Sequence, residues 1–528
     1  MRVSFKSAPK GAQTEVTERR GRPKVAIIVV LSSGWVLPQT GLKVHPNAIL
    51  LEFHTRLSRM RRPNPILALL TMLAFVVSIQ PSSFEPSVSP DLQIKWKSKT
   101  IQIALSTSLT LPSASITPES DVLGAVQRAL NSWSNAANIT FVVSTSKLQS
   151  ISPTGRGDGI NLITIAPTAE NLAIFAEGNN AARTRVFYDP ATGEISEADI
   201  VINPYPYSAE DVPLQFSTDG TPGTYDLEST FAHEIGHLLG LSHSGVIAAT
   251  MQASQALNGT YGLPALTERT LSEADIIAVR SVYGRCEKSG SVDGRIQSSV
   301  EGKLLPANAT HVWMEDLASG RVIASSLTTP SGRFSINCVP AGDYRVMAEY
   351  VDQQFLERTS LAAARESRQG GRPRGFHSVE ISSQLRVTPD KSTTLNYDLV
   401  PPQNSPPTLN PRFLGTNAEL STSPLPAEAG TKLTLYVGGE GVDQVPGSGL
   451  SVSSPFITVD PASLTLQQFH DSTPVISFDV TLAANAPPGD YSIRLQSNSG
   501  EIAYLPGGIT INPHSEFDHS IAGQNRLR

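Results

Sequence analysis

Two kinds of hydrophobic pattern follow one another along this chain. Up to about residue 285, short apolar runs alternate with segments in which apolar residues recur every three to four positions, so strands and helices are mixed. After Cys286 the helical period largely disappears, and short alternating runs separated by Gly, Pro, Asn and Asp continue almost to the end. We therefore expect an α+β domain followed by two all-β sandwich domains.

The first domain contains several short apolar runs typical of strands. The two runs that come last along the chain, at 184–188 and 198–202, are separated by the turn-forming stretch DPATG at 189–193. The predicted strands are 101–105, 139–143, 160–165, 184–188 and 198–202.

Three helices are predicted among these strands. The first begins at Thr117, an N-cap residue followed by a proline. The second covers 226–239, carries one apolar face, and ends at Gly240. The third begins at Ser272, another good N-cap residue, and ends at Gly284.

The start of the chain has the composition of an export signal. Four arginines precede a 14-residue apolar stretch at 66–79, and Pro/Ser-rich sequence follows it. Because a spanning helix usually needs about 20 residues, a signal peptide is favoured over a membrane anchor, and we expect no stable membrane span. No clear cleavage site follows the stretch, so a signal anchor stays open. We expect a secreted, extracellular or periplasmic protein whose true start is Met60.

Proline-rich segments mark the boundaries between the expected parts. The expected organisation is an over-extended or disordered leader at 1–59, a signal peptide at 60–85, the α+β domain at 92–285, β-sandwich domains at 287–401 and 405–513, and a disordered tail at 514–528.

Charge and cysteine content limit the class of protein. The formal net charge is −6, but residues 1–62 are basic, so the remainder carries −15. That acidic remainder argues against nucleic acid as a partner. Only Cys286 and Cys338 are present, which excludes a disulfide-rich scaffold and a thiolate zinc module. One disulfide and two free thiols are both compatible with the sequence.

One motif carries chemistry. His233 and His237 are four residues apart on the second predicted helix, so both imidazoles project from the same face and can bind one zinc ion. Gly240 lets the chain turn sharply, so that His243 can supply a third nitrogen ligand. Three protein ligands leave one position on the zinc for water. Glu234 lies beside that water, and zinc lowers the pKa of the water toward about 7, so the carboxylate can act as general base.

The extended motif and the methionine that follows it resemble the metzincins, and within them the matrixins. Ser244 follows the third histidine, as in matrixins, and Met251 lies where their Met-turn methionine lies. The segment 271–284 resembles the matrixin C-terminal helix, with Asp275 at one of its two acidic positions and Ala274 at the other.

This resemblance covers about residues 92–285 and implies a metzincin catalytic domain, a twisted mixed sheet with three helices. It also implies that Met251 forms an apolar floor beneath the metal. No histidine lies between Leu92 and Phe231, so a single catalytic zinc is expected, and Ala253 leaves no phenolic fifth ligand. Calcium sites cannot be read from scattered carboxylates that are expected at the surface: Asp158, Asp189 and Asp199.

The two β domains also resemble known types. The sequence at 290–296 together with 331–346 is similar to the carboxypeptidase regulatory-like sandwich, and 486–495 is similar to bacterial immunoglobulin-like domains. Neither carries a chemical motif, so spacer or adhesion roles and contact with a cell surface or matrix are expected. Three histidines outside the motif are expected at the surface: His311, His377 and His470.

The sequence therefore predicts an exported, bacterial-type, matrixin-like endopeptidase that acts on proteins or peptides. Substrate is expected to pair with an exposed strand edge at 184–188, and the pocket for the residue after the scissile bond is expected to be lined from after Met251 to about Leu263. No cysteine precedes Cys286, so latency through a thiolate on the zinc is not expected. The alternative is a surface adhesion or scaffold protein whose protease-like domain is inactive, and an intact Glu234 argues against it.

Overall fold

The computed structural model describes most of residues 92–511 and the strand Ala26–Val29. The expected signal peptide and tail, and the rest of the expected leader, lie outside the described residues. Further gaps fall at 154, 156, 176–179, 206–213, 264–266, 285, 301, 351–377, 400–407, 418 and 470–472. Most of the secondary structure is β, with few helices.

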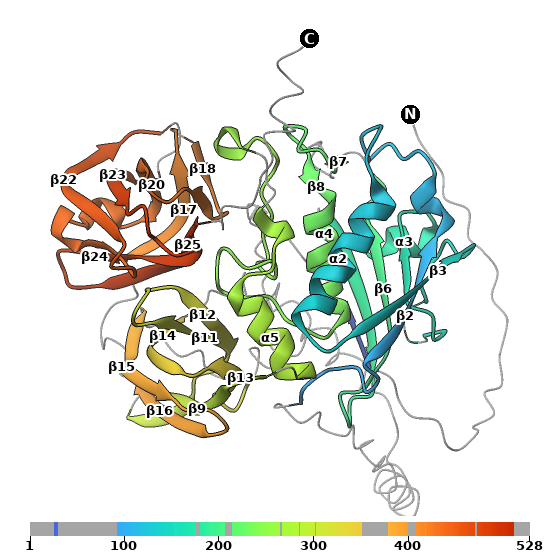
Figure 1. Ribbon diagram of the computed structural model, residues 1–528, viewed down its shortest axis with the longest axis horizontal. Helices are drawn as coiled ribbons and strands as arrows, with labels where there is room; N and C mark the ends of the chain where they lie inside the picture. Colours follow the sequence, from blue (N-terminus) through green and yellow to red (C-terminus); the bar gives the residue numbers. More distant parts are fainter. Residues whose placement is uncertain are drawn as a thin grey trace, which may run out of the picture.

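The first unit (Figure 1) contains a six-stranded sheet, whose strand order is β1-β5-β6-β4-β2-β3. Strands β2, β3, β4 and β6 run parallel, whereas β5 is antiparallel to both of its neighbours. All five predicted strands are present within a few residues. Their bounds, with β1, are β1 Ala26–Val29, β2 Thr100–Ser106, β3 Thr140–Ser146, β4 Leu162–Thr164, β5 Ala182–Tyr188 and β6 Ile195–Ile202.

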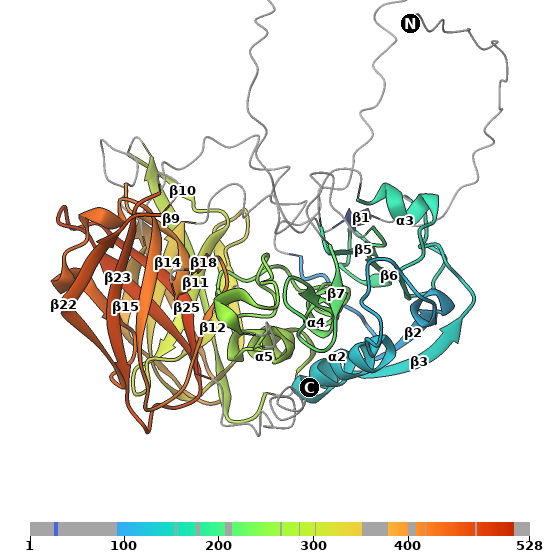
Figure 2. The same ribbon diagram turned by 90° about the horizontal axis from the view of Figure 1, so that it is seen from above.

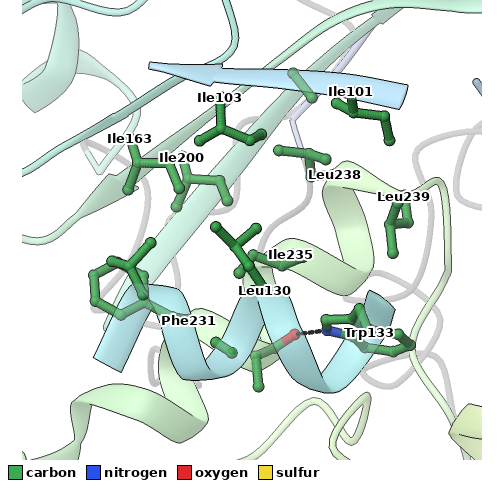
Figure 3. Packing of buried hydrophobic residues seen from close by; sticks show 14 of the residues in the cluster. Ile101, Ile103, Leu130, Trp133, Ile163, Ile200, Phe231, Ile235, Leu238 and Leu239 are labelled. Carbon is green, nitrogen blue, oxygen red and sulfur yellow. Dashed lines mark hydrogen bonds between the residues drawn. The ribbon is translucent and has the colours of Figure 1, made fainter. Parts of the chain in front are cut away.

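Two long helices, α2 (Val122–Ala136) and α4 (Leu227–Leu238), cover one face of this sheet. Figure 3 shows their apolar side chains meeting those of the strands in one core. Trp133 of α2 is fully buried there, and its indole N–H donates a hydrogen bond of 2.8 Å to the carbonyl of Ala232 in α4. The shorter elements of the unit are α3 Ala169–Ala173, β7 Phe216–Ser217, β8 Tyr225–Asp226 and α5 Glu273–Tyr283.

The first helix begins later than predicted. Thr117 donates its backbone N–H to the carbonyl of Phe216, and its hydroxyl forms a hydrogen bond of 2.9 Å with that of Ser120. Thr117 therefore belongs to the loop before the helix and does not cap it. Glu119 has a φ of 70°, which no helix accommodates. Asp121 is the N-cap, and its carboxylate accepts the N–H of Gly124.

The prediction that 184–188 forms a free edge is wrong for this structure. Strand β1 pairs antiparallel with the outer side of β5, in a register that places Ala26 opposite Tyr188 and Val29 opposite Arg185. Along this sheet the chain's own segment therefore occupies the position expected for an extended substrate.

Asp199 is buried, so the prediction that it lies at the surface is wrong. Its two carboxylate oxygens accept the backbone N–H groups of Ser152 and Leu162, each at 2.9 Å. The carboxylate thus fixes the loop that leads into β4.

Two modules, each built from two sheets, follow the first unit (Figure 2). In the middle module β9, β10, β13 and β16 form one sheet and β11, β12, β14 and β15 the other. In the C-terminal module β17, β18, β20, β22 and β23 form one sheet and β19, β21, β24 and β25 the other. The bounds are β9 Ser289–Val300, β10 Lys303–Pro306, β11 Thr310–Asp316, β12 Val322–Leu327, β13 Arg333–Pro340, β14 Gly342–Tyr350, β15 Val379–Val387, β16 Ser392–Leu399, β17 Asn410–Thr416, β18 Glu419–Ser421, β19 Leu425–Ala427, β20 Lys432–Glu440, β21 Leu450–Val452, β22 Ile457–Gln467, β23 Val475–Leu482, β24 Gly489–Gln496 and β25 Ile502–Ile511.

Both modules pack directly on the first unit, and α5 lies between that unit's sheet and the middle module (Figure 1). One buried apolar cluster contains residues of all three parts: Val246, Ala249 and Ala274 of the first unit, Trp313, Val322 and Met347 of the middle module, and Tyr504 of the C-terminal module. A disulfide joins Cys286, just after α5, to Cys338 on β13, with the Cα atoms 4.8 Å apart.

His311 is buried, not at the surface as predicted. Its ring stacks on Trp313 with centroids 5.1 Å apart, and its Nδ1 lies 2.7 Å from a carboxylate oxygen of Glu349. His377 and His470 lie outside the described residues. Within the described part of the chain, no helix is long and apolar enough to cross a membrane.

Candidate metal centre

Helix α4 carries the first two histidines of the motif. It starts at Asp226, whose carboxylate accepts the N–H of Ser229 at 2.8 Å and pairs with the guanidinium of Arg269 at 2.6 Å. This cap satisfies a free N–H at the helix N-terminus and fixes where the helix begins. His233 and His237 then lie one turn apart on the helix.

A sharp turn at Gly240 brings the third histidine back toward α4. Gly240 has a φ of 85°, and a Cβ at this position would collide with the backbone carbonyl of Ile94, so only glycine fits. The Nε2 atoms of His233 and His237 are 3.0 Å apart, and that of His243 lies 3.1 Å from His237 and 3.2 Å from His233.

Hydrogen bonds on the other side of two rings fix their tautomers. His233 Nδ1 lies 2.8 Å from the carbonyl of Thr250, and His237 Nδ1 lies 2.8 Å from that of Leu241. A carbonyl only accepts, so each Nδ1 carries the proton and each Nε2 presents a lone pair. Lone pairs from neighbouring rings at about 3 Å repel one another unless they share a cation.

The nitrogen positions fit a zinc ion. A Zn–N bond of about 2.0–2.1 Å in a tetrahedral site separates ligand nitrogens by about 3.3 Å, close to the distances found here. Burial lowers the pKa of His233 to about 4 and, with help from the neighbouring His233, that of His237 to about 3. Both rings therefore stay neutral near pH 7, as metal ligands must. The structure brings together all three histidines that the motif predicts.

Glu234 lies between the two histidines of α4 in sequence and is almost fully buried. Burial raises its pKa to about 7, against the effects of Thr184 and the charge of Arg183, which lower it. The hydroxyl of Thr184 on β5 donates a hydrogen bond of 2.5 Å to Glu234 Oε2. The carboxyl group is thus oriented by the strand beside the helix.

Met251 lies against the inner side of α4. A Cβ added to Gly236 would collide with the sulfur of Met251, so the thioether packs directly on the helix between the two histidines. Asp275 of α5 accepts the backbone N–H groups of Thr250 at 2.7 Å and Met251 at 3.2 Å. The same carboxylate accepts the N–H of Ser272 and so completes the N-terminal cap of α5.

Comparison with known proteins agrees with this geometry. Residues 178–284, which include β5, β6, α4 and α5, match the family model described as Matrixin. The chain contains a matrixin-like domain. It is 27% identical over 169 residues to the interstitial collagenase of Equus caballus, covering 32% of this chain and 29% of that protein. The chain is also 28% identical over 209 residues to the interstitial collagenase of Bos taurus, a match that covers 39% of this chain and 37% of that protein. The chain thus spans about a third of the length of these curated relatives.

Solved structures match at low similarity. They include a minor pilin of Streptococcus agalactiae, with 13% identity, 23% of this chain and 49% of that chain covered, and a TM-score of 0.15. A major pilin subunit of Bacillus cereus has 11% identity, 43% and 70% coverage, and a TM-score of 0.14. Scores at this level carry no argument about the fold or function of this chain.

Sequence reasoning missed the roles of two residues of the matrixin-like domain. Thr184 was predicted only as part of a substrate-pairing strand, yet its hydroxyl contacts Glu234. Tyr261, in the loop after Met251, carried no signal in the sequence beyond its place near a glycine pair. Both act across contacts distant in sequence, which a single sequence does not display.

Proposed function

We propose that this chain is a zinc-dependent endopeptidase, with His233, His237 and His243 as the metal ligands and Glu234 as the general base. The observation that carries the proposal is the convergence of the Nε2 atoms of three histidines, two of them on the helix that also carries the buried carboxyl group of Glu234. Zinc bound there would act as a Lewis acid on a peptide carbonyl and lower the pKa of a water molecule.

Glu234 would perform the proton transfers. Its carboxylate would take a proton from the attacking water and then deliver it to the leaving amine, and the burial that raises the pKa of this carboxyl group favours holding the proton between the two transfers. Thr184 would hold one carboxylate oxygen during both transfers, because its hydroxyl donates to Oε2. The buried position of Glu234 excludes bulk water and thereby strengthens these interactions.

An extended peptide is the proposed substrate, in agreement with the matrixin-like domain. It would pair with the outer side of β5, which requires that β1 be displaced from that side or be removed together with the expected signal peptide. We also propose export of the protein. The disulfide between Cys286 and Cys338 supports this, because such bonds persist in oxidising compartments.

The two C-terminal modules carry no chemical motif. We propose that they are the carboxypeptidase regulatory-like and immunoglobulin-like sandwiches that their sequences resemble, in a protein of bacterial type. Contact with a cell surface or matrix would be an additional role for their outward faces.

A digest of casein or gelatin tests the proposal. Purified protein loaded with zinc should cleave the substrate, and a chelator should abolish cleavage until zinc is restored. The matched control is Glu234→Ala loaded with the same metal. Absence of cleavage by the fully loaded wild-type protein would contradict the proposal and favour an adhesion or scaffold role.

A further inference from the structure

The loop from Gln252 to Leu263 follows the Met251 turn and, if the proposed function holds, borders the pocket for the residue after the scissile bond. Its first half is bound to the matrixin-like domain. Gln255 donates from its side-chain amide to the carbonyl of Asp226 at 2.9 Å, and Asn258 donates its backbone N–H to the carbonyl of Thr224 at 2.8 Å.

The second half of this loop is bound to the C-terminal module instead. The Tyr261 ring is only 4% exposed and belongs to the apolar core of that module. Its hydroxyl donates to the carbonyl of Leu414 at 2.9 Å and lies 3.3 Å from that of Ser423. Its backbone N–H donates to a carboxylate oxygen of Glu419 at 2.8 Å.

The backbone conformation of Tyr261 indicates that its contact with the C-terminal module positions this half of the loop. Tyr261 has φ 61° and ψ 14°, a left-handed conformation that a bulky residue adopts only where its surroundings stabilise it. The surroundings that stabilise it here are β17, β18 and the segment after β18, none of which belongs to the first unit.

The segment between His243 and Met251 is held by the same module. The backbone N–H of Ile247 donates to the carbonyl of Pro506 at 2.8 Å. Gly507 lies so close that a Cβ there would be 2.7 Å from a methyl group of Val246. The segment before the Met251 turn and the second half of the loop after it therefore both contact the C-terminal module.

We propose that the C-terminal module is a working part of the protease site, and that Tyr261 is the positioning residue through which it sets the loop at 252–263. This deepens the proposed function: the module, about 150 residues further along the chain, determines which side chain is accepted after the scissile bond. Leu263, two residues from Tyr261 and 43% exposed, lies on the part of the loop whose position Tyr261 controls.

Full-length protein with single substitutions tests this inference. Tyr261→Phe removes only the hydroxyl, and Glu419→Ala removes the acceptor from the C-terminal module without altering the loop sequence. Tyr436→Phe, on β20 of the same module, is the matched control. Tyr436 lies opposite Gly415 of β17 and its ring contacts Phe469, so the substitution should leave the hydrogen bonds of Tyr261 in place. Circular dichroism and zinc content should match the wild type in all three, which establishes that each variant is folded and loaded.

Two measurements are made on every variant. Hydrogen exchange of peptides from 252–263 should be about fivefold to tenfold faster in Tyr261→Phe and Glu419→Ala, as expected for losing one hydrogen bond, and unchanged in Tyr436→Phe. The second measurement is cleavage of peptides that differ only in the residue after the scissile bond. In Tyr261→Phe and Glu419→Ala, the ratio of kcat/KM for large and small side chains should differ from the wild-type ratio by about threefold or more.

Unchanged hydrogen exchange of the 252–263 peptides in both Tyr261→Phe and Glu419→Ala would overturn the inference, whatever the selectivity. Faster exchange with unchanged selectivity would also overturn it, because the loop would then be held by the module without determining specificity. If the zinc-loaded wild type cleaves no peptide, the proposed function fails and with it the role in specificity. The exchange data would still decide whether the module holds the loop, so the two failures are distinguishable.

Discussion

The hydroxyl of Thr184 donates a 2.5 Å hydrogen bond to Oε2 of Glu234 and also lies 3.1 Å from the backbone carbonyl of the same residue. A strand of the sheet thus contacts the proposed general base directly. Thr184→Val keeps the side-chain shape and removes the donor, so kcat should fall about tenfold, the effect of roughly 1.4 kcal/mol, with little change in KM.

The conservative variant Thr184→Ser should restore most of the activity lost in Thr184→Val, because it keeps the hydroxyl. Steady-state kinetics on one peptide substrate and zinc content by atomic absorption give both readouts. Equal loss in the serine and valine variants would show that the contact is merely packing.

Separate roles for the metal ligands and the base predict different defects. Glu234→Ala should remain folded and keep its zinc but lose at least about 10²-fold to 10⁴-fold in turnover. His237→Ala should lose zinc as well, because two imidazoles remain where three converge. Atomic absorption on both dialysed variants decides the matter, and equal zinc loss in the two would contradict these assignments.

Packing between α4 and the Met251 turn leaves no room for a side chain at Gly236. In Gly236→Ala the new Cβ would collide with the Met251 sulfur and lie 2.9 Å from the ring of Trp133. We expect a loss of about 1–3 kcal/mol in the free energy of unfolding and weaker zinc retention. The double variant Gly236→Ala/Met251→Ala should lose less than the two single effects added together, since the truncated side chain leaves space. Denaturant titration of the four proteins measures this coupling, and strict additivity would argue against the contact.

The stability of the zinc-free protein should fall as the pH rises from about 6.5 to 8. Burial raises the pKa of Asp199 to about 8, with nearby Glu197 adding to the effect, and raises that of Glu268 to about 8 and that of Asp490 to about 7. For an acid whose pKa is raised in the folded state, the stabilisation is complete below the unfolded pKa near 4 and is lost as the pH passes the folded value.

The melting temperature of the zinc-free protein, measured in steps across this range, should therefore decline toward pH 8. Carboxyl groups with a lowered pKa, such as Asp121, ionise below this window. The lowered pKa values of His233 and His237 oppose the trend only below about pH 6.5, where unfolded histidines still bind protons. Glu268→Gln should flatten part of the slope. A melting temperature that rises steadily from pH 6.5 to 8 would contradict this prediction.

Pairing of Ala26–Val29 with β5 predicts competition with substrate. Protein that begins at Leu92 lacks this strand and should show a lower KM for an extended peptide than the full chain, with a similar kcat. Protein that begins at residue 86 lacks the strand too and is the control, since it should match the shorter form. Identical KM values for all three would mean that the strand does not cover the substrate position.

The sequence predicted the parts of the fold that depend on local spacing. The i, i+4 histidines, the cap at Ser272 and the turn at Gly240 are all short-range features, and the structure contains them. The burial of Asp199 could not be predicted, because its partners come from a loop about 40 residues earlier.

Contacts between separate units were the least predictable. Alternation of apolar residues identifies the inward face of each sheet but says nothing about which outward residues meet another unit. Tyr261 and His311 both resemble ordinary loop or strand residues in the sequence, and each is buried by a segment from elsewhere in the chain. The surroundings of each residue exist only once the two units that contact one another there have folded.

The apolar cluster shared by Val246, Trp313 and Tyr504 also bears on how such a chain can change over evolutionary time. Tandem modules that are gained, lost or exchanged independently need a polar surface where they face their neighbours. Here, excision of either module would expose an indole or its partners to water and would uncover the segment that leads to Met251. Gene rearrangements at this boundary would therefore be selected against unless the interface changed with them, so the three parts are expected to be inherited together.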